Sequence, residues 1–203
     1  RGTSAEKPAL ALQSPSVGGW VELGRETLDS TADSMTVSSL ANKRYYMVLL
    51  DTVPAGVAEA SFRLGNSSVD TGTNYAYRYS IVGGTDVTGV NQTDSSDQGF
   101  GGVTLPTFDV GHISNLSGKE KLSTSQRVGQ NTAGAGTAPV RSELVWKWSN
   151  TSNPLDIIQA YKQAGAGTFA VGSELVVLGW DPADTHTTNF WEELASVDLS
   201  GGA

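Results

Sequence analysis

Short apolar or alternating runs follow one another from Trp20 to Leu199, separated by turns rich in Gly, Ser, Thr, Asn and Asp. Successive side chains of a strand point to opposite faces of a sheet, so alternating runs predict strands with one buried face. We expect each of these segments to form a strand. They are Trp20–Thr27, Ser34–Ser39, Arg44–Asp51, Ala58–Leu64, Tyr75–Val82, Thr107–Asn115, Lys121–Val128, Glu143–Trp148, Leu155–Tyr161, Ser173–Trp180 and Trp191–Leu199.

The segments between these runs do not read as crossover helices, so the strands are expected to pair antiparallel. Two packed sheets leave fewer open edges than one sheet does. We therefore predict an all-β antiparallel sandwich of about ten strands, jelly-roll-like, with a generic Greek-key sandwich as the alternative. Arg44–Asp51 and Leu175–Leu178 are nearly continuous apolar runs, which are typical of strands covered on both faces.

The chain divides into an arm and a domain. Residues 1–19 contain two prolines, end in Gly-Gly and show no period, which predicts an extended N-terminal arm or linker. Residues 20–203 are long enough for one sandwich domain. We expect Leu10 and Leu12 to anchor the arm on a neighbouring subunit, and a frayed terminus is the alternative.

Charge and composition exclude several classes of function. The formal net charge is −8, and residues 163–203 hold six acidic side chains and no Lys or Arg. Nucleic-acid binding needs a basic surface, so direct binding to DNA or RNA is not expected. The absence of cysteine excludes disulfides and thiolate metal sites. The apolar runs are too short to span a bilayer, so no membrane partner is expected.

Two polar segments, Gly83–Gly102 and Gly129–Pro139, are expected to be long loops. The first gathers oxygen ligands of the kind calcium prefers, at Asp86, Asn91, Asp94 and Asp97. Their spacing differs from that of an EF-hand, and polar turns collect these residues anyway. A second set, Asp181, Asp184 and His186, reads either as a metal site or as a capped turn, and the turn is the simpler interpretation.

No pattern of catalytic residues is present. The two histidines are His112 and His186, and no serine lies in a Gly-x-Ser-x-Gly elbow. His112 lies in an alternating run, which favours a packed or interface histidine. Glu192 and Glu193 are adjacent, so on a strand they would face opposite sides, which makes them poor candidates for an acid–base pair. We expect a protein that is not an enzyme and carries no cofactor.

Aromatic residues suggest one alternative function. Tyr75, Tyr77 and Tyr79 share one face of a predicted strand and could form a stacking platform for glycans. Five tryptophans could add to such a surface, although Trp and Tyr also fill sandwich cores and subunit interfaces. The sequence leaves both interpretations open.

Five long segments of the chain carry a resemblance to a known family. They are WVELGRETL, KRYYMVLL, TGTNYAYRYSIVGGTD, NTAGAGTAPVRSELVWKWSNTSN and SELVVLGWDPADTHTTNFWEELASVDL. In these segments the chain resembles small β-sandwich virion structural proteins (capsid, decoration or fibre) of marine tailed viruses of bacteria and archaea. The resemblance covers most of residues 20–199 and implies no catalytic residues.

The resemblance and the residue patterns together predict a non-enzymatic virion structural protein, either a capsid subunit or a decoration or fibre subunit. It would act by homo-oligomeric assembly, with copies of itself and other virion proteins as partners. Its expected location is the extracellular particle, after assembly in the host cytoplasm, and its acidity favours an outward position. Alternatives are a glycan-binding module of a fibre or adhesin that recognises host surface glycans, and a cell-surface filament subunit joined by strand addition.

Overall fold

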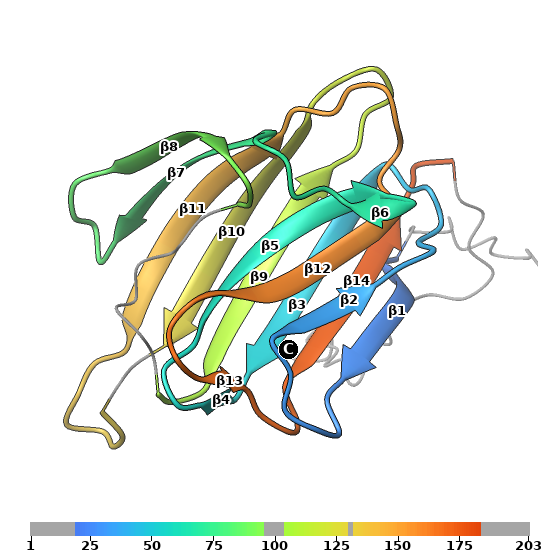
Figure 1. The fold of residues 1–203 in the computed structure, drawn as a ribbon. Helices are drawn as coiled ribbons and strands as arrows, with labels where there is room; N and C mark the ends of the chain where they lie inside the picture. The colour runs from blue at the N-terminus through green and yellow to red at the C-terminus, as the bar shows by residue number, and fades with distance from the viewer. Residues whose placement is uncertain (1–18, 96–103, 130–131, 184–203) are drawn as a thin grey trace, which may run out of the picture.

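The computed structural model describes residues 19–95, 104–129 and 132–183, which form β-strands joined by turns and loops (Figure 1). Fourteen strands lie within this part of the chain. They are β1 Val21–Thr27, β2 Ser34–Val37, β3 Tyr45–Thr52, β4 Pro54–Ala55, β5 Glu59–Asn66, β6 Ser68–Val69, β7 Tyr75–Ile81, β8 Val87–Gln92, β9 Thr107–Ser114, β10 Lys121–Gly129, β11 Val140–Trp148, β12 Ile157–Ala164, β13 Thr168–Phe169 and β14 Glu174–Trp180.

Two unequal antiparallel sheets make up the fold. Eight strands form the large sheet in the order β1-β14-β3-β9-β10-β11-β7-β8, and four form the small sheet in the order β2-β12-β5-β6. A short ribbon of β13 and β4 stands apart from both. Figure 1 shows the small sheet in front of β14, β3 and β9, with β11, β7 and β8 extending the large sheet beyond it. The predicted all-β antiparallel sandwich is confirmed.

The core lies between the two sheets and takes every second side chain of the central strand β3. On β3, Tyr46, Val48 and Leu50 are each 2% exposed or less, whereas the side chains between them are half-buried or exposed. Phe62 of β5 and Ile158 of β12 meet them from the small sheet as part of the same buried cluster. Each such side chain contributes about 1.5–3 kcal/mol when fully buried.

Buried polar groups also connect the sheets. Arg127 of β10 forms an ion pair with Asp109 of β9 at 3.0 Å, and the two side chains are 3% and 1% exposed. The same guanidinium donates a hydrogen bond of 2.8 Å to the carbonyl oxygen of Ala60 in β5. A buried charge is costly unless it is paired and hydrogen-bonded, so these contacts favour one alignment of the sheets.

Ten of the predicted strand segments coincide with β1, β2, β3, β5, β7, β9, β10, β11, β12 and β14, with ends that differ by a few residues. The remaining segment, Trp191–Leu199, lies outside the described residues. The short strands β4, β6 and β13 have two residues each, too few to carry a period.

The prediction of a loop at Gly83–Gly102 is wrong in its first half, because strand β8 forms there and pairs with β7. Gly89 of β8 lies against the ring of Tyr77, and a Cβ at this position would overlap that ring. The strand is also irregular, since Asn91 has a φ of 54° and the register shifts between Tyr75 and Tyr77. A strand with a glycine at its centre and no clear alternation gives little signal in the sequence.

Candidate functional site: the outer face of the large sheet

The candidate site is the face of the large sheet that points away from the small sheet. Directly paired residues of antiparallel strands share a face, so the strand register maps this surface. One row across β14, β3, β9 and β10 consists of Trp180, Tyr45, Ser114 and Leu122. The next row consists of Leu178, Met47, His112 and Thr124, followed on β11 by Val145.

Adjacent tyrosines on β3 show how the strand divides its side chains between the faces. Tyr46 is 0% exposed, and its hydroxyl lies 3.1 Å from the carbonyl oxygens of Ala41 and Leu155 and accepts from the Lys43 amide at 3.0 Å. Burial is the main cause that raises the pKa of Tyr46. Tyr45 points the other way and is half-buried on the outer face.

Aromatic rings gather at the end of this face near β1. The Tyr45 and Trp180 rings stack with centroids 5.3 Å apart and planes 15° from parallel. Trp20 lies 6.5 Å from Trp180 at 56°, and 6.1 Å from His112 at 57°. The Arg44 guanidinium lies 5.4 Å from the centroid of the Tyr45 ring. These rings come from β3, β14, β9 and the residue before β1, so they are brought together by the fold.

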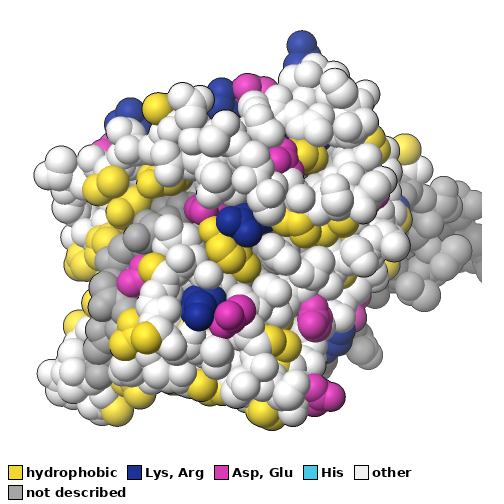
Figure 2. All heavy atoms as spheres, in the orientation of Figure 1, with side chains coloured by type: hydrophobic (Ala, Val, Ile, Leu, Met, Phe, Trp, Pro, Cys, Tyr) yellow, Lys and Arg dark blue, Asp and Glu magenta, His cyan; other side chains and the backbone are white. Residues whose placement is uncertain are grey.

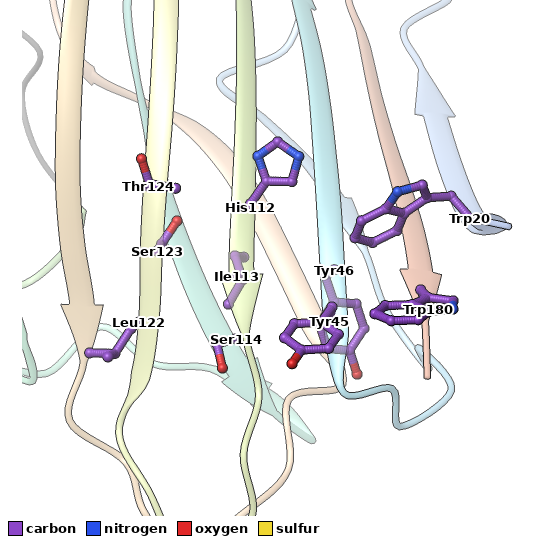
Figure 3. Close-up of a pocket in the computed structure, with 10 residues that line it drawn as sticks. All are labelled: Trp20, Tyr45, Tyr46, His112, Ile113, Ser114, Leu122, Ser123, Thr124 and Trp180. Atoms are coloured by element: carbon purple, nitrogen blue, oxygen red, sulfur yellow. The ribbon is translucent and has the colours of Figure 1, made fainter. Parts of the chain in front are cut away.

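An open depression of about 470 Å³ lies beside these rings. We call it the aromatic hollow and define it by Trp20, Tyr45, Trp180, His112, Ser114 and Thr124. Figure 3 shows the three large rings on one side, Thr124 of β10 on the other, and His112 and Ser114 of β9 between them. Among the described residues that line it, none is Lys, Arg, Asp or Glu.

Apolar side chains also lie exposed on the same face, some beside the hollow on β10 and β11 and others toward the opposite ends of β9 and β10. Leu122 and Val145 are 56% and 52% exposed, and Phe108 and Val128 are each 39% exposed. Val110, next to Phe108 on the same face, is half-buried. We call these five residues of β9, β10 and β11 the apolar patch.

Ion pairs of both signs flank the apolar patch. Arg141 lies 3.5 Å from Glu143, and their side chains are 63% and 52% exposed. Lys147 lies 2.9 Å from Glu120, and Arg78 of β7 lies 3.1 Å from Asp86. The surface around the patch therefore carries neighbouring positive and negative charges. Figure 2 shows a similar mixture on the opposite side of the molecule, over the small sheet.

The predicted glycan platform at Tyr75, Tyr77 and Tyr79 needs correction. Tyr75 is 2% exposed, and its hydroxyl bonds the backbone of Leu64 and Asp70. Burial raises its pKa above the ordinary value. Tyr77 and Tyr79 pack against the core and are half-buried. The shared face of the three rings was predicted correctly, but it is the inner face of the sheet.

The oxygen ligands considered for calcium do not converge in the described residues. Asp86 pairs with Arg78 on the outer face, whereas Asp94 is 6% exposed and accepts hydrogen bonds from Ser61 and Tyr161. Asp97 lies outside the described residues. Within the described part of the chain, no group of three or more His, Asp or Glu side chains could hold a metal ion.

The WDPADTH segment begins as the turn interpretation predicts. Asp181 accepts hydrogen bonds from the backbone amides of Arg44 at 3.2 Å and Ala183 at 2.9 Å. The second of these bonds is local and closes a turn of the kind that Asp favours. Several residues considered from the sequence lie outside the described residues: Leu10, Leu12, Asp184, His186, Glu192 and Glu193.

The sequence contained only part of the signal for the aromatic hollow. Trp20 and Trp180 are two of the five tryptophans considered for a stacking surface, and adjacent residues of a strand, such as Tyr45 and Tyr46, face opposite sides. The register that pairs Tyr45 with Trp180 is a long-range property of the sheet. No spacing in the sequence reveals it.

No family model, curated protein or solved structure matches this chain. Among its described residues, the structure shows no helix with the length and apolar character needed to cross a membrane.

Proposed function

We propose that this protein is a non-enzymatic structural subunit that acts by assembling with copies of itself through the outer face of the large sheet. The observation that carries the proposal is the apolar patch, where Leu122 and Val145 are more than half exposed in the middle of a sheet. Water-exposed apolar side chains grouped on one face are typical of interaction surfaces.

The strands beside the patch support the same function. The apolar runs of β3 and β14 are typical of strands covered on both faces, and the small sheet covers their inner side. Their outer side chains include Met47, Leu49 and Leu178, which are half-buried. A second subunit on the outer face would complete the burial that this composition favours.

The charges around the patch favour a second copy over an unrelated partner. A two-fold interface places the same patch on both subunits, so each positive group must find a negative one on an equivalent surface. The neighbouring pairs Arg141–Glu143 and Lys147–Glu120 supply both signs at the border of the apolar patch. A surface of a single sign would repel its own copy.

The sequence resemblance suggests a virion as the setting, in the capsid, its decorations or a fibre. This setting stays a prediction, as does the role of Leu10 and Leu12 as anchors of the arm. Assembly through strand addition also stays a prediction, and β1 and β8 are the edges of the large sheet at which it would occur.

Sedimentation velocity of the full chain between 1 and 200 µM tests the proposal, these concentrations being chosen to bracket roughly micromolar affinities. We expect oligomers in the wild type and a shift to monomers in the double variant Phe108→Asp with Val145→Asp. Val171→Asp is the matched control, because Val171 is 58% exposed but lies in the turn before β14. It should assemble as the wild type does.

Thermal unfolding of the same three proteins excludes a folding defect as the cause. The introduced carboxylates lie on the surface, so all three proteins should be folded and should show a cooperative unfolding transition. A wild type that stays monomeric at the highest concentration would overturn the proposal. An assembly that is equally strong in the double variant would do so as well.

A further inference from the structure

The aromatic hollow combines two surfaces that differ in chemistry. One wall is formed by the rings of Trp20, Tyr45 and Trp180, which are half-buried and leave part of each ring accessible. The floor and the far wall carry the imidazole of His112, the hydroxyls of Ser114 and Thr124, and the exposed side chain of Leu122 at one end (Figure 3). A ligand that suits both surfaces needs an apolar face and several neutral hydrogen-bonding groups.

The polar groups of the hollow are available for a ligand. Within the described residues, the hydroxyls of Ser114 and Thr124 have no hydrogen-bond partner in the protein, and His112 is exposed. Hydroxyls donate and accept, and a neutral imidazole does the same through its two nitrogens. The hollow thus offers donors and acceptors beside an aromatic wall.

The lack of charge narrows the class of ligand. No acidic or basic side chain is among the described residues that line the hollow, and the Arg44 guanidinium beside it lies against the Tyr45 ring. The lining itself therefore offers no charge-assisted bond to a phosphate, sulfate or carboxylate. An apolar peptide would leave the hydroxyls of the floor without partners, which costs affinity. A pyranose ring has both a carbon–hydrogen face and a rim of neutral hydroxyls.

We propose that the aromatic hollow binds a neutral pyranose of a glycan, with the ring stacked on Trp180 and Tyr45 and its hydroxyls bonded to Ser114, Thr124 and His112. Its volume of about 470 Å³ lies within the usual range of small-molecule sites. This site differs from the predicted platform at Tyr75, which is buried on the other face of the sheet.

The glycan site does not compete with the whole of the assembly surface. Ser114 in the hollow and Phe108 in the apolar patch lie at opposite ends of β9, which separates them by about 20 Å along the strand. Two residues of the apolar patch border the hollow: Leu122, which pairs with Ser114, and Val145, which pairs with Thr124. A subunit paired through the Phe108 end could therefore keep the hollow open.

Isothermal titration of the full chain tests the proposal with soluble probes, so that avidity does not contribute. The neutral probes are lactose, cellohexaose, maltohexaose and mannohexaose, and 3′-sialyllactose is the charged counterpart of lactose. We expect at least one neutral probe to bind, and sialyllactose to bind no better than lactose. Trp180→Ala and Tyr45→Ala should each weaken binding at least about tenfold.

Matched variants separate stacking from folding. Tyr45→Phe keeps the ring and should retain most of the affinity, whereas Thr124→Val removes a hydroxyl without changing the shape of the side chain and should weaken binding about three- to tenfold. Phe108→Ala, at the other end of the face, should bind the glycan as the wild type does. If Trp180→Ala does not fold, Tyr45→Ala and Thr124→Val decide the result.

Three results would overturn the glycan proposal: no neutral probe binds at millimolar concentration, the sialylated probe binds better than lactose, or the alanine variants bind as well as the wild type. The oligomeric state of Trp180→Ala, measured in parallel, should equal that of the wild type. Failure of glycan binding and failure of assembly are therefore distinguishable.

Discussion

The two faces of the large sheet carry similar residues, but those of the inner face are buried and those of the outer face are partly or largely exposed to solvent. On the inner face, Tyr46 is fully buried and its hydroxyl is bonded to the backbone. On the outer face, Tyr45 stacks with Trp180 at the surface. The same contrast holds for charges, because the Arg127–Asp109 pair is buried and the Arg141–Glu143 pair is more than half exposed.

This contrast assigns different roles to the faces. Groups on the inner face contribute to stability, since removal of one partner leaves another without a bond in a site that water does not reach. Groups on the outer face contribute little to stability, so their composition is free to serve binding. Equivalent substitutions on the two faces should therefore separate stability from binding.

The largest effect is expected for the buried ion pair. Arg127→Met leaves the carboxylate of Asp109 buried, and should lower the free energy of unfolding by about 3–5 kcal/mol. Arg141→Met on the outer face should change it by less than about 0.5 kcal/mol, because exposed ion pairs contribute little. Urea unfolding followed by tryptophan fluorescence measures both.

A double variant distinguishes the loss of a charge from the loss of packing. Arg127→Met with Asp109→Leu removes both charges, and should recover much of the stability that the single substitution loses. Equal stability of the single variants at the two positions, Arg127→Met and Arg141→Met, would show that the inner and outer pairs do not differ as we infer.

The inner face of the sheet was only partly predictable from the sequence. On β11 apolar and charged residues alternate, and Leu144, Trp146 and Trp148 are buried as that alternation predicts. On β9 and β10 the alternation points the other way, because Phe108, Val110, Leu122 and Val128 lie on the outer face and the buried positions include the Asp109–Arg127 ion pair. The shared face of Tyr75, Tyr77 and Tyr79 followed from the same rule. Which side of the sheet that face occupies depends on the partner sheet, and no local pattern contains this information.

The aromatic hollow was less predictable for the same reason. Trp20 lies before the first strand and Trp180 ends the last described one, so their contact depends on the pairing of β1 with β14. Edge strand β8 was missed because Gly89 provides space for the Tyr77 ring rather than an apolar side chain. Both features are produced by contacts between residues distant in sequence or by a missing side chain.

A smaller effect is expected from the two adjacent tyrosines. Tyr46→Phe removes a hydroxyl that bonds the Lys43 amide and lies beside the buried Leu155 carbonyl, and should lower the free energy of unfolding by about 2 kcal/mol. Tyr45→Phe removes a hydroxyl from the outer face and should change stability by less than about 0.5 kcal/mol. Thermal unfolding of both variants against the wild type measures the difference, and a larger loss for Tyr45→Phe would contradict the assignment of the two faces.

The smallest effect concerns the response of stability to acid. Burial raises the pKa of Asp70, but hydrogen bonds to its carboxylate from the Trp148 indole at 2.7 Å, the Gly72 amide and the Asn74 side chain outweigh it and lower the pKa below the ordinary value of 3.8. A carboxyl with a lowered pKa in the folded state binds its proton less readily there than in the unfolded chain. Its contribution is therefore complete above pH 3.8 and is lost as the pH falls through the lower, folded value.

Asp70→Asn isolates this contribution from that of the other carboxyl groups. The Asn side chain keeps one acceptor oxygen, but its NH2 group replaces the second oxygen and would face N–H donors that the Asp70 carboxylate accepts from. The variant should therefore be about 1 kcal/mol less stable than the wild type at pH 7. The difference should shrink as the pH falls below 3.8, because the wild type alone loses the interaction there. Urea unfolding at intervals between pH 2 and 7 measures it, and Asp86→Asn, which removes an exposed ion pair with Arg78, is the outer-face control. A difference for Asp70→Asn that stays constant with pH would show that the carboxylate charge does not stabilise the inner face at Trp148.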